Sequence, residues 1–343
     1  MASGELSLRW FDRPPAEVSL DLPEFLDWLG GSALFHLPGA DRSRARLLSG
    51  GLHGNEPSGF HALHALLRDP PPLATDVLLF LGNARAACLQ PRFTHRFVPG
   101  EEDMNRVWVG EPFTALRRLA HQVLRALEPF PLEAAVDLHN NSGQNPCYAL
   151  LPAGAEPRRV GLARAWTARV IVCEGLALGT LSEGMAPRCP AVVVECGKCG
   201  CPLADGAALA GARRWLGSKV AWEPEPAGAG PPETHRALCR VEVPREQEVA
   251  VGEALAGEDL VIDPLLDRHN FQPLAAGTAL ARRATPRGRL VARDLAGRDV
   301  SEAFLYQEGD AVRLAREVVP IMITTRASIV KSDCLCYLTL PVS

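Results

Sequence analysis

The chain has 343 residues, of which 47% are hydrophobic and 22% are charged, and its net charge is −4. This composition is typical of a globular protein that can bury one large core or two smaller ones. The slight acidity and the lack of a basic stripe argue against nucleic acid as a partner. No uninterrupted apolar stretch approaches about 18 residues, and the N-terminus lacks a basic segment followed by an apolar one. We therefore expect no membrane span, no export and a cytoplasmic location.

The first two thirds of the chain alternate between strand-like and helical patterns. Residues 1–44 predict a short lead-in that packs on the first domain, with a helix over 22–29 whose first turn contains a proline. From 45 to 218 the expected strands are 45–50, 77–82, 134–139, 147–151, 169–173 and 191–195, and the expected helices are 57–68, 112–128, 155–168 and 204–217. Strands separated by helices predict an α/β domain with a parallel or mixed sheet flanked by helices.

The last third has a different pattern. Residues 219–234 are rich in proline and glycine and lack apolar periodicity, which indicates a linker. Residues 235–343 contain short apolar runs, at 239–243, 290–293 and 321–325, between Gly, Pro and Asp turns. This pattern predicts a smaller, β-rich C-terminal domain.

Three of the predicted strands end in side chains that can bind a metal or move a proton. His53 and Glu56 follow the first of them, His139 ends a second, and Glu195 ends a third. Two imidazoles and a carboxylate suit Zn²⁺ with one open position, which leaves Glu195 to transfer protons. Asp137 shares the strand face of His139 and is a candidate partner for the metal ligands.

The His53-x-x-Glu56 pair is weak when it is taken alone. Nine histidines and 40 acidic residues among 343 give about one such triple by chance. The pair could also mark the start of a helix, where the positive end of the helix favours Glu56. Its significance therefore depends on the other two strand ends.

Several blocks of the sequence resemble the succinylglutamate desuccinylase/aspartoacylase family, which is related to the zinc carboxypeptidases. The matching blocks are Gly51-Leu-His53-Gly-Asn-Glu56-Pro, Asn83-Ala-Arg85-Ala, Arg92-Phe93, Asp103-Met-Asn105-Arg106, Asp137-Leu-His139-Asn140 and Val194-Glu195-Cys-Gly197. Their order is that of the family over about 145 residues. In the C-terminal half the likeness is limited to residues 270–277 and Tyr306. The resemblance implies a zinc-carboxypeptidase-like mixed sheet.

The resemblance also implies a role for each site residue. His53, Glu56 and His139 would hold one Zn²⁺, and Glu195 would be the general base that later protonates the leaving amine. Arg92 corresponds to the arginine that polarises the scissile carbonyl. Asn105 and Arg106 would bind the α-carboxylate of the substrate, and Tyr306 would close the pocket. The implied activity is hydrolysis of the amide bond in a small N-acyl amino acid.

Two departures from the family pattern concern the substrate. The segment between Arg92 and Asp103 is longer than in the family. Aspartoacylases also carry an arginine about ten residues before the catalytic glutamate, which pairs with the aspartate side chain of the substrate. Here that region contains Ser182 and Glu183, and the nearest arginine is Arg188. An unpaired buried carboxylate is costly, so we expect a substrate other than N-acetylaspartate.

Other functions remain open at this stage. The same metal site could serve a metallocarboxypeptidase that cleaves peptides. Alternatively, the protein could be a non-catalytic zinc or thiol protein, because Cys196, Cys199 and Cys201 form a cluster with a C-x-x-C pattern. No second C-x-x-C lies at zinc-knuckle spacing, and with no sign of secretion the ten cysteines are expected to be free thiols. Assembly into a homo-oligomer is also possible.

Overall fold

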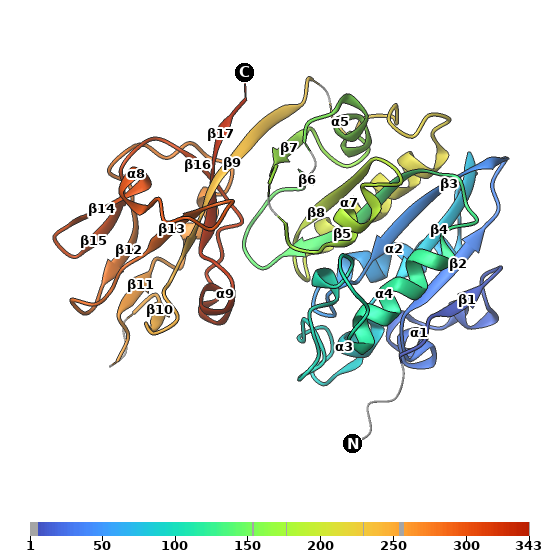
Figure 1. Cartoon of the computed structure of the whole chain (residues 1–343), viewed down its shortest axis with the longest axis horizontal. Coiled ribbons are helices and arrows are strands. Elements are labelled where there is room, and N and C mark those ends of the chain that lie inside the picture. The colour runs from blue at the N-terminus through green and yellow to red at the C-terminus, as the bar shows by residue number, and fades with distance from the viewer. Residues whose placement is uncertain (1–5, 153, 176, 229, 254–256, 343) are drawn as a thin grey trace. The chain divides into compact units, whose positions relative to one another are not determined.

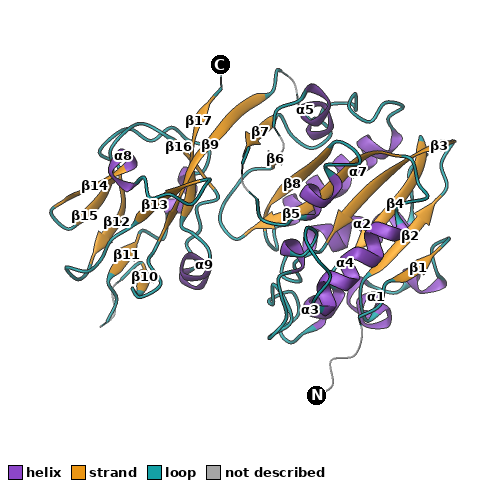
Figure 2. Cartoon of the chain, viewed as in Figure 1, coloured by secondary structure: helices purple, strands orange, loops and turns teal. Residues whose placement is uncertain are grey.

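A computed structural model of the chain describes residues 6–152, 154–175, 177–228, 230–253 and 257–342 (Figures 1 and 2). The chain divides into two compact units. The first comprises Met1–Asn140, Cys147–Val170 and Ala177–Pro232, and the second comprises Asn141–Pro146, Ile171–Leu176 and Glu233–Ser343. Among the described residues no helix is both long and apolar enough to cross a membrane.

A mixed sheet forms the centre of the first unit. Its strands are β1 (Arg9–Phe11), β2 (Ala33–Leu37), β3 (Asp41–Gly50), β4 (Thr75–Leu81), β5 (Leu132–Asn141), β6 (Tyr148–Leu151) and β8 (Ala191–Lys198), and β7 (Arg169–Val172) spans a boundary between the units. They are hydrogen bonded in the order β1-β2-β4-β3-β5-β8-β6. β3 is parallel to both β4 and β5, whereas β6 is antiparallel to β8. The ends of β3 and β5 therefore lie at the same edge of the sheet.

Helices cover both faces of this sheet. They are α1 (Leu22–Leu29), α2 (Pro57–Arg68), α3 (Ala84–Cys88), α4 (Ala115–Ala126), α5 (Pro157–Ala163), α6 (Leu181–Met185) and α7 (Pro202–Gly217), with short 3-10 turns at Ala16–Ser19 and Met104–Arg106. Adjacent residues of β3 point to opposite faces, as strand geometry requires. Leu48 joins a core with α1, α2 and α7, and Leu47 joins a core with α4 and α6.

Helix α2 lies directly against strand β3. A Cβ atom at Gly59 would lie 2.8 Å from the Cα atom of Gly50, so neither position has room for a side chain. Pro57 occupies the first turn of α2, where its missing N–H costs no hydrogen bond. This close approach fixes the short turn between β3 and α2, which contains His53 and Glu56.

The second unit is rich in strands. They are β9 (Glu233–Glu242), β10 (Val249–Val251), β11 (Leu260–Ile262), β12 (Ala279–Arg283), β13 (Val291–Asp294), β14 (Leu305–Glu308), β15 (Ala311–Leu314), β16 (Val319–Ile321) and β17 (Cys336–Pro341). The helical segments are Leu266–His269 (3-10), α8 (Ser301–Phe304) and α9 (Ala327–Ser332). One sheet has the order β10-β11-β12-β15-β14, and β17 pairs with β9 and β16 in a second layer, with β13 on the other side of β9. The core between them is apolar.

The predicted fold class is confirmed: a mixed sheet is flanked by helices, and a β-rich part follows it. Several boundaries differ from the prediction; strand β3, for example, begins at Asp41 rather than at position 45. The helix expected at 112–128 begins at Ala115, that at 155–168 ends at Ala163, and the strand expected at 321–325 ends at Ile321, where Met322 takes a positive φ of 57°. Strand β2 was not predicted, because its short run Ala33–Leu37 is almost wholly buried and shows no polar alternation.

Candidate functional site

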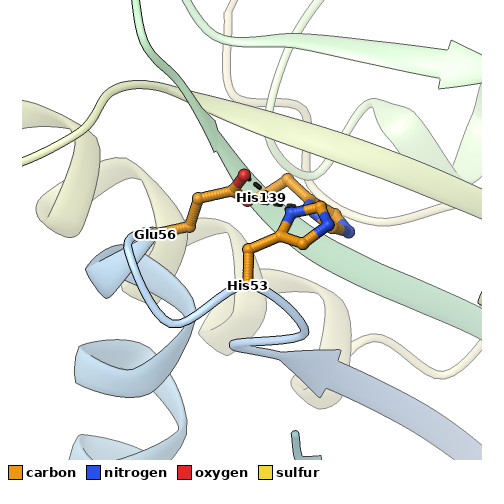
Figure 3. A group of neighbouring side chains, drawn as sticks. All are labelled: His53, Glu56 and His139. Atoms are coloured by element: carbon orange, nitrogen blue, oxygen red, sulfur yellow. Dashed lines mark hydrogen bonds and ion pairs between the residues drawn. The ribbon is translucent and has the colours of Figure 1, made fainter. Parts of the chain in front are cut away.

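His53, Glu56 and His139 meet in the first unit (Figure 3). His53 lies in the turn that follows β3, Glu56 lies immediately before α2, and His139 lies in β5. One potential ligand atom from each residue lies within 4.8 Å of the other two, and all three side chains are buried. Among the described residues this is the one group of His, Cys, Asp and Glu side chains whose ligand atoms come close enough to hold an ion.

Both imidazoles present the same nitrogen to Glu56. His53 Nδ1 lies 2.7 Å from Glu56 Oε1, and His139 Nδ1 lies 2.7 Å from Glu56 Oε2. Burial alone would raise the pKa of the Glu56 carboxyl, but the two imidazoles hold that pKa well below its usual range. Glu56 is therefore a carboxylate whose two oxygens each face a histidine. Glu56 does stand at the start of α2, as the alternative interpretation expected, but its side chain makes no capping hydrogen bond there, and its two oxygens face the histidines.

The outer nitrogen of each imidazole contacts an aspartate. His53 Nε2 lies 2.9 Å from Asp103 Oδ1, and His139 Nε2 lies 2.7 Å from Asp137 Oδ2. A carboxylate at Nε2 holds the proton there and leaves the Nδ1 lone pair free for a metal, which is the usual arrangement behind metal-binding histidines. The predicted contact of Asp137 with a ligand is thus present. The part played by Asp103 was not predicted, although the residue belongs to a block that resembles the family.

The donor set fits a divalent cation. Two buried imidazoles have three carboxylates in contact with them, those of Glu56, Asp103 and Asp137. Burying this much negative charge is unfavourable unless it is compensated. Two imidazole nitrogens and a carboxylate also match the ligands of catalytic zinc sites, in which a fourth position stays open. Residues His53, Glu56 and His139 would hold such an ion.

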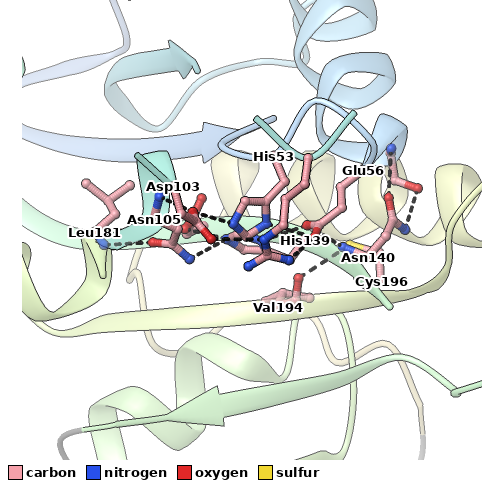
Figure 4. A network of polar contacts seen from close by, with 12 residues as sticks. His53, Glu56, Asp103, Asn105, His139, Asn140, Leu181, Val194 and Cys196 are labelled. Atoms are coloured by element: carbon pink, nitrogen blue, oxygen red, sulfur yellow. Dashed lines mark hydrogen bonds and ion pairs between the residues drawn. The ribbon is translucent and has the colours of Figure 1, made fainter. Parts of the chain in front are cut away.

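Asn140 connects the segments that carry these groups (Figure 4). Its backbone N–H donates to Glu56 Oε2 (3.1 Å), and its side-chain oxygen accepts from the N–H of Ser58 (3.0 Å) in the first turn of α2. Its amide nitrogen donates to the carbonyl oxygen of Gly197 (3.2 Å) in β8. One buried amide therefore fixes the turn before α2 to the ends of β5 and β8.

Glu195 lies in β8 and is buried. Burial raises the pKa of its carboxyl to about 8, while His139 opposes this rise. The charge of Glu56 raises this pKa as well. A carboxyl with a pKa near neutrality can accept and return a proton under ordinary conditions. The third predicted strand end therefore supplies a group suited to acid–base chemistry.

Two arginines of the loop before Asp103 have different partners. Arg92 forms an ion pair with Asp27 of α1, with 2.5 Å between Nη2 and Oδ2, and Asp27 is half exposed. Arg96 instead donates from Nε to Asp103 Oδ2 (2.9 Å), and its Nη1 lies 3.7 Å from Glu56 Oε1. The arginine that contacts the metal-ligand group is thus four positions beyond the one expected from the family resemblance.

The three predicted substrate-binding residues, Asn105, Arg106 and Tyr306, differ in burial and in their partners. Asn105 is buried, with its amide nitrogen 3.3 Å from His139 Nε2 and its side-chain oxygen accepting from the N–H of Leu181 (3.1 Å). Arg106 is half-buried and donates from Nη1 to the carbonyl oxygen of Asn105 (2.7 Å). Tyr306 belongs to β14 of the second unit and is 41% exposed.

Glu183 and Arg188, which we weighed for substrate specificity, both have structural partners. The carboxylate of Glu183 accepts hydrogen bonds from the backbone N–H groups of Leu178 and Gly179 at the start of α6. Arg188 is exposed and donates to the carbonyl oxygen of Leu124 (2.9 Å). Both charged side chains therefore have hydrogen-bond partners on the backbone of the protein itself.

The next question is whether the cysteines form disulfides or a metal site. All ten are free thiols, as expected. In the C-x-x-C pattern, burial raises the pKa of the Cys196 thiol well above its usual range, and Cys196 Sγ donates to the carbonyl oxygen of Val194. Within the described ranges, no cysteine belongs to a group that could hold a metal ion.

Comparison with known proteins agrees with this geometry. Residues 43–203 match the family model of the succinylglutamate desuccinylase/aspartoacylase catalytic domain. A search of curated protein sequences finds no significant match.

Solved structures share the fold at low sequence identity. A succinylglutamate desuccinylase/aspartoacylase from Rhodobacter sphaeroides has a TM-score of 0.59 at 15% identity, covering 90% of this chain and 88% of that one. The succinylglutamate desuccinylase from Chromobacterium violaceum has a TM-score of 0.55 at 17% identity, with coverage of 90% and 88%. Murine aminoacylase 3 has a TM-score of 0.53 at 16% identity, with coverage of 89% and 97%. Residues 43–203 thus match the catalytic-domain model of the succinylglutamate desuccinylase/aspartoacylase family, and the chain shares its fold with solved structures that carry this name.

Proposed function

We propose that the protein is a zinc-dependent amidohydrolase that removes the acyl group from a small N-acyl amino acid. The observation that carries this proposal is the arrangement of His53, Glu56 and His139. Both histidines turn Nδ1 toward one carboxylate and hold Nε2 against an aspartate. This is the arrangement that a catalytic zinc site requires of its protein ligands.

The chemistry divides between the bound ion and the side chains. Zinc in such a site lowers the pKa of a coordinated water from about 16 to about 7. The Glu195 carboxylate would accept a proton from the attacking water and return it to the amide nitrogen as the bond between that nitrogen and the acyl carbon breaks, which gives a carboxylate and a free amine. Burial raises the pKa of Glu195 to about 8, and a nearby cation favours its ionised form, which can act as the base.

The substrate needs a group that recognises its carboxylate. Arg106 is the candidate, because its guanidinium is half-buried and can bind a carboxylate through two parallel hydrogen bonds. Asn105 contacts both His139 and Leu181, so in this proposal it fixes the position of Arg106 beside the metal-ligand group. The roles of Arg92 and Tyr306 stay predictions, and Arg92 forms an ion pair with Asp27.

The amino acid released is proposed to be other than aspartate. Recognition of an aspartate side chain calls for an added cation, but Arg188 is exposed and bound to the Leu124 carbonyl. Glu183, whose carboxylate accepts from the N–H of Gly179, adds no positive charge. A neutral or apolar amino acid fits these surroundings better.

A substrate screen tests the proposal. Purified protein loaded with Zn²⁺ is incubated with N-acetyl and N-succinyl amino acids and with short peptides, and release of free amine is measured with and without a chelator. We expect amine release from at least one N-acyl amino acid, loss of this activity with the chelator, and a fall of at least about 10²-fold in Glu195→Gln. Hydrolysis of peptides alone would favour a metallocarboxypeptidase. No chelator-sensitive hydrolysis of either class would refute the proposal.

A further inference from the structure

We propose that Asp205 is a positioning residue for the metal site, and that it acts on Glu56 through Ser58 and Asn140. The inference rests on the proposed function, because it takes Glu56 as a ligand of the ion. Asp205 lies in the first turn of α7, outside the metal-ligand group. The pattern of strand ends that predicts the ligands does not single it out, since it belongs to a helix.

A continuous series of hydrogen bonds leads from Asp205 to Glu56. Ser58 Oγ donates to Asp205 Oδ1 (2.6 Å), and the amide nitrogen of Asn140 donates to Ser58 Oγ (2.8 Å). The backbone N–H of Asn140 then donates to Glu56 Oε2 (3.1 Å), the same oxygen that lies 2.7 Å from His139 Nδ1. The carboxylate of α7 is therefore connected to an oxygen atom of a metal ligand, and Figure 4 shows Asn140 beside that ligand.

The directions of these hydrogen bonds depend on Asp205. A carboxylate only accepts, so the Ser58 hydroxyl gives its single proton to Asp205 and keeps its lone pairs for the Asn140 amide. A hydroxyl that donates to a carboxylate is also polarised, which makes its oxygen a stronger acceptor. Without the carboxylate, the Ser58 proton has no fixed acceptor, and the hydrogen bond to Asn140 loses this support.

Burial makes the connection rigid. Ser58 is fully buried and Asn140 is 4% exposed, so water does not compete for their hydrogen bonds. Ser58 also lies two positions after Glu56, in the first turn of α2, and the next residue, Gly59, packs against the backbone of β3 with no room for a side chain. A displacement of Ser58 would therefore displace Glu56 through the backbone as well as through Asn140.

A second explanation for Asp205 concerns α7 alone. A carboxylate in the first turn of a helix is favoured by the positive end of that helix, whatever its side chain contacts. This explanation requires the charge, whereas the series of hydrogen bonds requires an acceptor for the Ser58 proton. Asp205→Asn removes the charge but keeps an acceptor in its amide oxygen, and Asp205→Ala removes both.

Zinc affinity, measured by competition with a chromophoric chelator, tests the inference. We expect Asp205→Ala to weaken zinc binding about threefold to tenfold, less than the loss of a direct partner of a ligand would, and Asp205→Asn to weaken it less than about twofold. The matched control is Asp69→Asn, which breaks the ion pair between Asp69, at the end of α2, and Arg213 of α7 (2.7 Å). It removes a contact between the same two helices, but zinc affinity should stay within about twofold of the wild type.

A double-mutant cycle with Ser58→Ala separates positioning from general destabilisation. If Asp205 acts through the Ser58 hydroxyl, Asp205→Ala should change zinc affinity by less than about twofold once Ser58 is already replaced by alanine. Ser58→Ala alone should weaken zinc binding at least as much as Asp205→Ala, so it tests the inference even if Asp205→Ala does not fold. The visible absorption of the Co²⁺-loaded protein, which depends on ligand geometry, should change in both single variants and stay the same in Asp69→Asn.

Three results would overturn the inference: additive losses in the cycle, unchanged zinc affinity in both Asp205→Ala and Ser58→Ala, or an equal loss in Asp69→Asn. None of these measurements needs a substrate. If zinc affinity depends on Asp205 as expected but the wild type hydrolyses nothing, the proposed function fails while the positioning role stands. If the wild type is an active zinc hydrolase whose zinc affinity is the same without Asp205, the inference alone fails, and a wild type that binds no zinc would refute both.

Discussion

Replacement of Asp137 by asparagine should weaken metal binding while leaving the fold intact. Asp137 is 1% exposed, and its Oδ2 lies 2.7 Å from His139 Nε2. Asparagine has nearly the same shape but no charge, so it holds the Nε2 proton less firmly and makes Nδ1 a weaker ligand. Its amide can also turn its N–H group toward Nε2, which favours the tautomer whose Nδ1 carries the proton and cannot bind a metal.

The size of the effect follows from the position of Asp137 behind the ligand. Loss of a carboxylate that supports a metal-binding histidine typically lowers metal affinity by about 10-fold to 100-fold. At a fixed concentration of free metal that saturates both proteins, this is a loss of about 1.4–2.7 kcal/mol in the stabilisation that the metal gives to the folded state. The loss should be near the upper end, because His139 and Asp137 are both almost fully buried and water cannot replace the carboxylate.

Competition with a chromophoric chelator measures the affinity directly, and urea unfolding with and without zinc measures the same quantity as a difference in free energy. The matched control is Asp76→Asn. Asp76 is also a buried aspartate that contacts an imidazole, with Oδ2 2.9 Å from His36 Nε2, but it lies outside the metal-ligand group. Asp76→Asn should lower the stability of the zinc-free and zinc-loaded forms equally and leave zinc affinity unchanged.

Equal zinc affinity in wild type and Asp137→Asn would refute the role given to Asp137. An equal loss in Asp76→Asn would show that general destabilisation, rather than the histidine contact, governs binding.

Three further predictions concern the fold. Arg46→Met removes a fully buried guanidinium whose Nε lies 2.6 Å from Glu133 Oε1, and it should lower the free energy of unfolding in urea by about 3 kcal/mol. The loss should not be larger, because Arg44 still pairs with the Glu133 carboxylate. Gly59→Ala should cost about 1–3 kcal/mol because its Cβ would overlap the backbone of β3, whereas Gly206→Ala, at an open position in α7, should gain about 0.5–1 kcal/mol in the same assay. Burial would raise the pKa of Asp76, but hydrogen bonds to its carboxylate hold that pKa below its usual value. The stability that it contributes is therefore present above about pH 4, and in acid titrations the wild type should lose stability relative to Asp76→Asn as the pH falls below that value.

The sequence was sufficient to predict the positions of the site residues that lie at or just after the ends of strands. His139 and Glu195 follow apolar runs that any α/β sheet would bury, and parallel strands bring such ends to one edge. His53 and Glu56 required only that a turn follow β3 and that α2 begin at Pro57. Periodicity and strand polarity fix these positions, so local patterns were enough to predict them.

The groups carried by the loop could not be predicted in the same way. Arg96 lies between two of the blocks that resemble the family, Arg92-Phe93 and Asp103-Met-Asn105-Arg106, and belongs to neither. Its place beside Glu56 depends on a backbone hydrogen bond to Gly54, which is 42 positions earlier in the chain (96 − 54 = 42). Asp103 could have been suspected, because it precedes Asn105 in a block that was recognised, but no local pattern pairs it with His53. Contacts of this kind are decided by tertiary packing.

The same distinction explains how the site keeps its shape. The sheet positions the ends of β3, β5 and β8, but the side chains at these ends could still rotate. Asn140 restrains the Glu56 carboxylate through its backbone N–H, and its amide bonds to the backbone of Ser58 and of Gly197. Asp103 and Asp137 then orient the two imidazoles. The strands therefore bring the ligands together, and buried amide and carboxylate partners select the nitrogen that each imidazole offers, which is the property that a metal site needs before the ion arrives.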